Sequence, residues 1–160
     1  MSPQYSRLIP PPIQDMSDFI GATPLLRLWN LGTRDDLEVY GKLELFNPAG
    51  SAKDRTARSL LRDAMASGRV REGSLVVESS SGNLGIALAR ACRLEGVRFL
   101  CIVDARTNRS AVTAMKAYGA QVEVIWEPDP DLGDLLATRR RRVAQILAEV
   151  PGAVNLNQYE

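Results

Sequence analysis

The sequence predicts an α/β fold, an open twisted parallel sheet with helices on both faces, and three observations support this. From residue 37 onward, short runs of β-forming residues alternate with longer segments of helical periodicity. Glycine or proline follows most of these segments, so the connections between them are short. The stretch at 97–104 (VRFLCIVD) is apolar throughout its centre, which is typical of a strand covered on both faces. A β-α-β-α order with short connections then predicts parallel strands.

The individual elements follow from the same signals. Residues 37–45 (LEVYGKLEL) partly alternate in character and predict the first strand. The other strands are short β-forming runs, expected at 74–78, 97–104, 120–126 and 153–158. The helices carry apolar residues at helical spacing and are expected at 54–67, 83–94, 110–118 and 132–150. A glycine or proline marks the end of each helix: Gly68, Gly96, Gly119 and Pro151.

The composition is that of an ordinary globular protein, with 160 residues, 45% of them hydrophobic and 24% charged, and a net charge of +1. We expect no nucleic-acid and no membrane partner, because the charge is near neutral and no apolar run approaches the roughly 20 residues that a membrane span needs. The first residues lack the build of a signal peptide, so a cytoplasmic location is expected. Residues 1–36 predict an N-terminal arm, and 37–160 predict the α/β domain.

The chain has no histidine and two cysteines, Cys92 and Cys101. Without histidine the commonest general base and metal ligand are missing, so we expect no metal site and catalysis by lysine, carboxylates, hydroxyls or a cofactor. The cysteines are expected to be buried thiols. The run RRRR at 139–142 predicts a solvated helix face with packed aliphatic stems, with an anion or nucleic-acid patch as the alternative.

A single lysine, Lys53, lies where a turn gives way to a helix. Pro48, Gly50 and Ser51 predict a tight turn directly before it. The partial positive charge of a helix N-terminus disfavours an ammonium ion there, and a neutral amine can form a Schiff base. The alternative is a solvated lysine at a helix start.

The loop SSSGNLG (79–85) connects a predicted strand to a predicted helix and collects three hydroxyls and an amide. Backbone N–H groups at such a helix start form an anion site suited to a carboxylate or a phosphate. The alternative is an N-cap cluster, since serine and asparagine are good caps. Because both this loop and the Lys53 turn follow predicted strands, and ligands bind at the carboxyl ends of parallel strands, we expect them to face one crevice.

Four stretches together resemble the cysteine synthase-like family of pyridoxal-phosphate enzymes: IGATPLLRL (20–28), KLELFNPAGSAKDRTA (42–57), VESSSGNLGIALA (77–89) and YGAQVE (118–123). The resemblance covers nearly all of residues 19–160 and implies the N-terminal part of a fold type II enzyme with pyridoxal 5′-phosphate as its cofactor. The SSSGNLG loop, IVD (102–104), EPD (127–129) and NQY (157–159) resemble members that join O-phospho-L-serine to L-glutamate on the route to 2,3-diaminopropionate, a building block of siderophores and peptide antibiotics.

The resemblance assigns roles to individual residues. Lys53 matches the lysine that carries the cofactor covalently, and Asn83 matches the asparagine that hydrogen-bonds the cofactor's 3′-oxygen. The implied reaction is β-replacement on an amino acid, in which the freed amine of Lys53 takes the Cα proton.

The substrate's α-carboxylate is also assigned partners by the resemblance. Ser80, Ser81 and the backbone around Gly82 match the loop that grips this carboxylate, and Gln158 matches a glutamine that also reaches it. Leu84 departs from the family's sulfhydrylases, which have threonine at this position, and therefore argues against cysteine synthase with sulfide as nucleophile.

Family members are about twice this length, and their phosphate-binding glycine loop has no match here. The resemblance therefore implies that this chain is the N-terminal portion of a homodimeric enzyme, that residues 1–36 pack on a missing C-terminal domain, and that the arm and strand 37–45 are poorly buried. It also implies weak or no cofactor retention by the chain alone. An inactive, truncated binding module is the alternative from another functional class.

Overall fold

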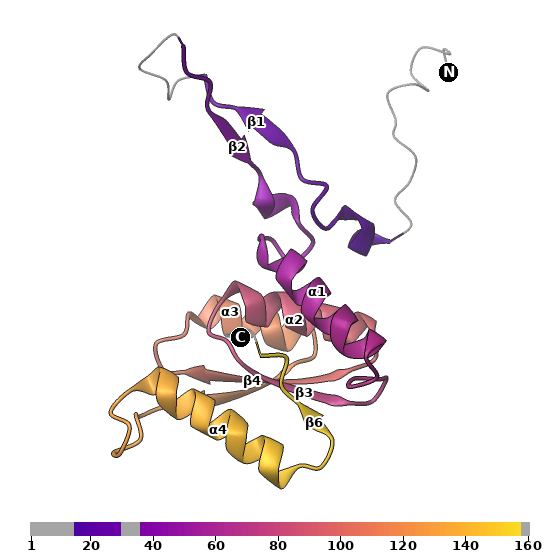
Figure 1. Ribbon diagram of the computed structural model, residues 1–160. Coiled ribbons are helices and arrows are strands. Elements are labelled where there is room, and N and C mark those ends of the chain that lie inside the picture. The colour runs from indigo at the N-terminus through magenta and orange to yellow at the C-terminus, as the bar shows by residue number, and fades with distance from the viewer. Residues whose placement is uncertain (1–14, 30–35, 158–160) are drawn as a thin grey trace.

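The computed structural model of the chain describes residues 15–29 and 36–157. A four-stranded parallel sheet forms its body, in the order β5-β4-β3-β6 (Figure 1). Its strands are β3 (Leu75–Ser79), β4 (Arg98–Asp104), β5 (Gln121–Ile125) and β6 (Ala153–Val154). Within the described ranges, no helix is long and apolar enough to cross a membrane.

Helices cover both faces of this sheet, which confirms the predicted fold class. Three of them lie on one face, α1 (Lys53–Ala66), α2 (Asn83–Leu94) and α3 (Arg109–Ala117), while α4 (Leu135–Glu149) covers the other (Figure 1). The predicted bounds of α2 agree with the structure because glycines flank that helix in the sequence at Gly82 and Gly96.

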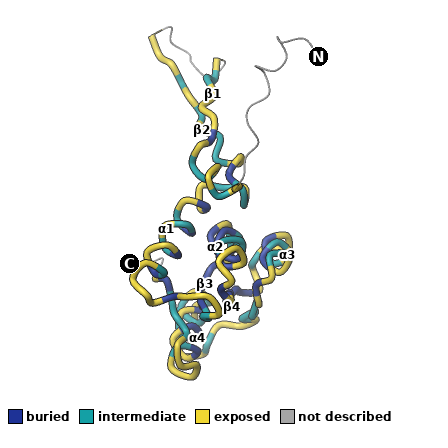
Figure 2. The backbone as a smooth tube through the Cα atoms, turned by 90° about the vertical axis from the view of Figure 1, so that its right-hand side faces the viewer, coloured by how far each residue is buried: buried dark blue, intermediate teal, exposed yellow. Residues whose placement is uncertain are grey.

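Two hydrophobic cores result from the alternation of side chains along the strands. Val76 belongs to the larger core under α1, α2 and α3, whereas the next residue, Val77, belongs to the smaller core under α4. Leu88 and Met115 are fully buried in the larger core. Burial therefore concentrates in the body of the molecule (Figure 2).

The N-terminal region forms a separate hairpin that projects from the body. It contains the 3-10 helix η1 (Met16–Phe19), β1 (Leu25–Arg27), β2 (Tyr40–Lys42) and the 3-10 helix η2 (Glu44–Phe46), and β1 pairs antiparallel with β2. The prediction of a strand over 37–45 in the parallel sheet is wrong in length and in place. The place was wrong because alternation indicates a half-covered strand but does not say which strand it pairs with. The length was wrong because the chain turns after β2, where the N–H of Asn47 donates to the carbonyl of Glu44 at 3.1 Å.

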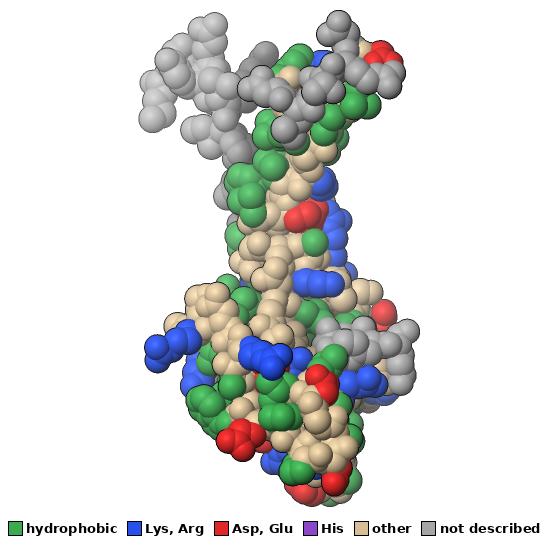
Figure 3. All heavy atoms as spheres, turned by 90° about the vertical axis from the view of Figure 1, so that its left-hand side faces the viewer, with side chains coloured by type: hydrophobic (Ala, Val, Ile, Leu, Met, Phe, Trp, Pro, Cys, Tyr) green, Lys and Arg blue, Asp and Glu red, His purple; other side chains and the backbone are tan. Residues whose placement is uncertain are grey.

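The hairpin leaves its apolar side chains exposed, as expected for the arm and strand 37–45. Trp29 is 74% exposed, Leu25 62% and Leu45 65%. Figures 2 and 3 show the exposed backbone and the hydrophobic side chains along this projection. Contiguous exposed apolar surface of this kind is typical of an interaction site.

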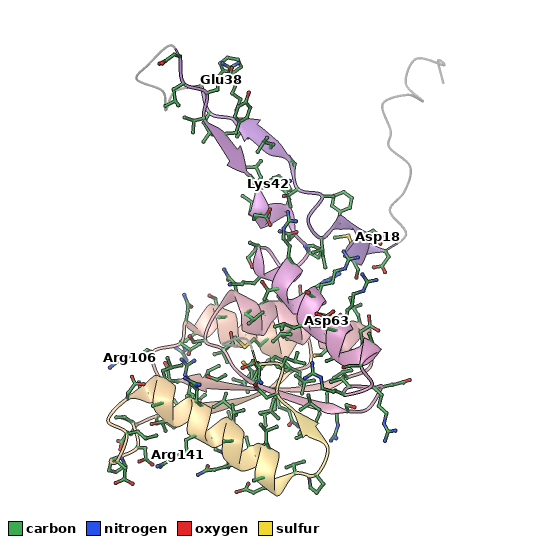
Figure 4. The ribbon with its side chains drawn as sticks, in the orientation of Figure 1. Asp18, Glu38, Lys42, Asp63, Arg106 and Arg141 are labelled. Atoms are coloured by element: carbon green, nitrogen blue, oxygen red, sulfur yellow. The ribbon has the colours of Figure 1, made fainter. Side chains whose placement is uncertain are left out.

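The arginine run in α4 departs from the expected solvated face at Arg139, while Arg140 is exposed and Arg141 and Arg142 are half-buried. Arg139 is only 6% exposed and its Nε lies 3.2 Å from Oδ2 of Asp104 at the end of β4. Arg142 pairs with Glu123 of β5 at 2.7 Å, and Arg141 pairs with Asp129. Arg141 lies on α4 below the sheet in Figure 4. The pairs of Arg139 and Arg142 attach α4 to the sheet and the pair of Arg141 attaches it to the preceding loop, which disfavours the nucleic-acid alternative.

Candidate active site

Lys53 is the first residue of α1, as the sequence predicts, and a tight turn leads into it. Gly50 adopts a φ of 88°, in the left-handed region that favours glycine, and its N–H donates to the carbonyl of Asn47 at 2.7 Å. The N–H of Lys53 donates to Oγ of Ser51 at 3.2 Å. Among the described residues, the exposed side chain of Lys53 makes no hydrogen bond or ion pair. Its amine is therefore available to an aldehyde.

The buried carboxylate of Asp54 holds this turn from the helix side. Its Oδ1 accepts from the N–H of Ala49 at 2.9 Å, and its Oδ2 accepts from the N–H of Ser51 at 3.4 Å. Asp54 is 3% exposed. A buried carboxylate that accepts backbone N–H groups is a strong anchor, so the direction of the chain into Lys53 is well determined.

The second loop leaves the carboxyl end of β3, as predicted, and Ser80 fixes its course. The N–H of Ser80 donates to the carbonyl of Ile102 at 3.2 Å, while its own carbonyl accepts from Sγ of Cys101 at 3.1 Å. Oγ of Ser80 accepts from the N–H of Gly85 at 2.9 Å. Ser80 is thus a buried part of the helix cap, and only the hydrogen of its hydroxyl is left to donate to a ligand.

The tip of the loop is open where the sequence predicts an anion site. Ser81 and Asn83 are exposed, and Gly82 occupies the N-cap position of α2 without a side-chain cap. Within the part of the chain that the structure describes, the N–H groups of Asn83 and Leu84 have no acceptor. Capping therefore accounts for Ser80 but not for the other two serines or Asn83, and the free N–H groups at a helix start favour an anion.

Gly85 of α2 leaves room for close contact with α3 and with the carbonyl of Ser80 in the loop. A Cβ at this position would lie 2.8 Å from Cε of Met115 and 3.1 Å from the carbonyl oxygen of Ser80. Leu84, in contrast, packs into the larger core at 4% exposure. The residue that departs from the sulfhydrylase pattern thus contributes packing where a threonine would present a hydroxyl.

A cavity of about 180 Å³ opens beside the same strand end, between α4 and the chain after β6. Glu78, Ser79 and Asn157 contribute to its lining. Nδ2 of Asn155 donates to the carbonyl of Val77 at 2.7 Å, which holds the segment against β3. Gln158 lies outside the described residues, so its predicted carboxylate contact stays a prediction. Residues 155–157, which directly precede Gln158, reach the end of β3.

The two loops meet the sheet differently, which corrects one step of the prediction. The turn before Lys53 leaves η2 and not a strand of the parallel sheet. Helices α1 and α2 nevertheless pack in one core on the same face, through residues such as Ala57 and Leu88. No hydrogen bond joins the Lys53 side chain to residues 79–85 among the described ranges, and a shared crevice stays a prediction.

Sequence reasoning missed the buried pair of Asp104 and Arg139 at this edge of the sheet. Their side chains are 10% and 8% exposed. A signal was present, because Arg139 lies four residues before Val143 and seven before Ile146, which puts it on the buried face of α4. Arg106, two residues beyond Asp104, marks the same edge in Figure 4.

Comparison with known families and proteins identifies relatives of this chain. The family described as "Pyridoxal-phosphate dependent enzyme" matches residues 16–160. Two relatives named N-(2-amino-2-carboxyethyl)-L-glutamate synthase are 46% identical over 142 residues in Ralstonia nicotianae and 46% over 140 residues in Cupriavidus metallidurans. The matches cover 89% and 88% of this chain but only 42% and 41% of the relatives, so the chain spans less than half their length.

Solved structures are similar in fold. An O-ureido-L-serine synthase superposes with a TM-score of 0.79 at 34% identity, covering 94% of this chain and 45% of that protein. A hydrogen sulfide-producing enzyme from Fusobacterium nucleatum superposes with a TM-score of 0.82 at 25% identity, covering 94% and 47%.

Proposed function

Because the chain belongs to the family of pyridoxal-phosphate dependent enzymes, we propose that it forms the lysine-bearing part of a β-replacement enzyme. The proposed substrates are O-phospho-L-serine and, as nucleophile, L-glutamate, and the product is N-(2-amino-2-carboxyethyl)-L-glutamate. The observation that carries this proposal is the exposed amine of Lys53 at the start of α1, which has no partner among the residues that the structure describes, in a chain 46% identical to relatives of that name. The buried Leu84 supports glutamate over sulfide.

Lys53 is the proposed attachment point of pyridoxal 5′-phosphate and the base that removes the Cα proton. When bound, the cofactor supplies an electron sink for the charge that develops at Cα. The exposed amide of Asn83 is the proposed hydrogen-bond partner of the cofactor ring. The turn held by Asp54 fixes the backbone at Lys53, from which its amine is proposed to reach the substrate.

The loop 80–83 is the proposed grip on the substrate carboxylate. Ser80 can donate its hydroxyl hydrogen, Ser81 and the backbone at Gly82 are accessible, and the free N–H of Asn83 points to the same role. Gln158 is proposed to complete this grip from the chain after β6. A carboxylate held here would present Cα in a fixed orientation to the lysine.

The exposed apolar hairpin supports a proposal for the assembly. We infer that residues 1–36 pack on the additional chain that the longer relatives possess, and that the complete enzyme is a cytoplasmic homodimer. Chains of the relatives' length would cover Trp29, Leu25 and Leu26, all of which are about half exposed or more here. A longer chain would also contribute the phosphate-binding loop, so the present chain alone is expected to retain the cofactor weakly.

Selective labelling of lysine tests the proposal. The chain has three lysines, Lys42, Lys53 and Lys116, and Lys116 is exposed on the last turn of α3. Brief incubation with pyridoxal 5′-phosphate, reduction with borohydride and peptide mass spectrometry should label Lys53 about tenfold faster than Lys116, because the proposed site around Asn83 and the loop 80–83 would hold the cofactor beside the Lys53 amine. Equal labelling of the two would overturn the role of Lys53.

Product analysis tests the substrates. The relatives' length of chain, offered O-phospho-L-serine with either glutamate or sulfide, should yield the glutamate adduct by mass spectrometry. Cysteine as the main product would instead identify a sulfide-using enzyme.

A further inference from the structure

Hydrogen bonds around one carboxylate join the two N-terminal motifs, 20–28 and 42–57. Oε1 of Glu44 accepts from Oγ1 of Thr23 at 3.0 Å and from Nη2 of Arg55 at 2.8 Å. Oε2 accepts from Nδ2 of Asn47 at 2.7 Å and from Nε of Arg55 at 3.1 Å. Four donors from three segments thus converge on Glu44.

Asn47 carries the connection onward to the turn before Lys53. It is 3% exposed, its Oδ1 accepts from the N–H of Gly21 at 2.9 Å, and its Nδ2 also donates to the carbonyl of Glu44 at 2.8 Å. The carbonyl of Asn47 accepts the N–H of Gly50 inside the turn. The side-chain amide is therefore occupied at both its oxygen and its nitrogen, and no other side chain reproduces this set.

The close approach of Arg55 explains why the first motif has glycine at position 21. It has a φ of 89°, and a Cβ there would lie 2.5 Å from Nη1 of Arg55. Nη2 of Arg55 donates to the carbonyl of Gly21 at 3.0 Å. The guanidinium therefore lies directly against the Gly21 backbone, where a side chain would displace it.

We propose that Glu44 is a positioning residue for Lys53. Together Gly21, Glu44, Asn47 and Arg55 form a clamp that holds the entry of the turn 48–52, while Asp54 holds its exit. The Lys53 side chain has no partner of its own among the described residues, so the backbone of this turn is what fixes its starting point, the direction of the Cα–Cβ bond. The cofactor-related part of the inference rests on the proposed function; the ordering of the turn does not.

The hydrogen bonds of the clamp to the Glu44 carboxylate persist at neutral pH. Hydrogen bonds from Arg55 and Asn47 lower the pKa of Glu44 to about 2, so the carboxylate is ionised far below neutrality. The clamp therefore acts as a fixed support and not as a pH switch.

The test compares Glu44→Gln with Glu149→Gln in this chain. Glutamine keeps the shape of Glu44 but turns an NH₂ group toward its donors, whereas Glu149 is an exposed partner of Arg142 on α4 at 3.6 Å and serves as the matched control. In Glu44→Gln, amide exchange over residues 47–54 should rise about tenfold, with α2, α3 and α4 unchanged. The labelling ratio of Lys53 to Lys116 by pyridoxal 5′-phosphate should fall about fivefold.

The outcomes separate the clamp from the proposed function. Faster exchange with an unchanged labelling ratio would assign Glu44 a structural role and overturn the inference, as would no change in either. If the unaltered chain labels Lys53 no faster than Lys116, the proposed function fails. If amide exchange over residues 47–54 is also unchanged in Glu44→Gln, the clamp is overturned as well. If Glu44→Gln does not fold, Thr23→Val removes one of the four donors and should lower the ratio about twofold.

Discussion

Replacing Asp104 by alanine is expected to destabilise the chain far more than removing an exposed carboxylate. Asp104 is the buried partner of Arg139, whose Nε lies 3.2 Å from Oδ2, and its Oδ1 accepts the N–H of Arg106 at 2.9 Å. The substitution leaves the Arg139 guanidinium in the interior at 8% side-chain exposure without an anion beside it. An unpaired buried charge is among the costliest single changes in a protein.

The magnitude follows from these contacts. Breaking one side of a buried ion pair costs about 3–5 kcal/mol, and the lost bond to the Arg106 N–H adds about 1 kcal/mol. Against a total free energy of unfolding of about 5–15 kcal/mol, a loss of about 4 kcal/mol or more is severe. The double variant Asp104→Leu with Arg139→Met buries two apolar side chains instead and should recover most of the loss.

Urea unfolding measures the difference. With a slope of about 1–3 kcal/mol per molar urea, the midpoint of Asp104→Ala should fall by about 2 M. Glu123→Ala is the control, because Glu123 pairs with Arg142 at 36% side-chain exposure and its loss should cost about 1 kcal/mol or less. Equal shifts for Asp104→Ala and Glu123→Ala, or a double variant no more stable than the single one, would refute the assignment of Arg139 as a buried ion.

Two further predictions concern the core. Gly85→Ala should lower the free energy of unfolding by about 1–3 kcal/mol, because the new methyl group would meet Cε of Met115 and, less yieldingly, the Ser80 carbonyl; an unchanged melting temperature would contradict this packing. Burial raises the pKa values of the Cys92 and Cys101 thiols from 9.0 to about 12, so their contribution to stability is complete below pH 9 and is lost as pH rises towards 12. The slope should reach about 1.4 kcal/mol per pH unit for each thiol, and replacing both cysteines by alanine should flatten the alkaline limb of a stability profile; a profile with the same slope in that variant would exclude the thiols as its cause.

Much of the fold could be predicted from the sequence because its signals are local. Helix α2 occupies 83–94 as predicted, since Gly82 and Gly96 bracket a run of small and apolar residues. The strand prediction at 37–45 was wrong because alternation over nine residues does not say which segment pairs with it. Residues 25–27 supply the partner, and the bonds around Glu44 end the strand after Lys42.

Part of the candidate site could also be predicted from local signals, and part depends on contacts between distant segments. Lys53 at the start of α1 and the loop 79–85 after β3 lie where the sequence places them, because turn residues and helix starts are adjacent in the chain. The use of Ser80 as a buried cap was not predictable, since it depends on Ile102 and Cys101 from the next strand. The roles of the six predicted site residues stay predictions until labelling and product analysis test them.

The sequence by itself determined the order of strands and helices from β3 onward, the position of Lys53 at a helix start and the family, because each depends on short stretches whose residues lie close along the chain. Only the tertiary structure decided that Arg139 is a buried ion, that Glu44 gathers donors from Thr23, Asn47 and Arg55, and that β1 and β2 pair in a hairpin outside the parallel sheet. These features arise where distant segments meet, and the burial and charge of a side chain depend on what lies against it.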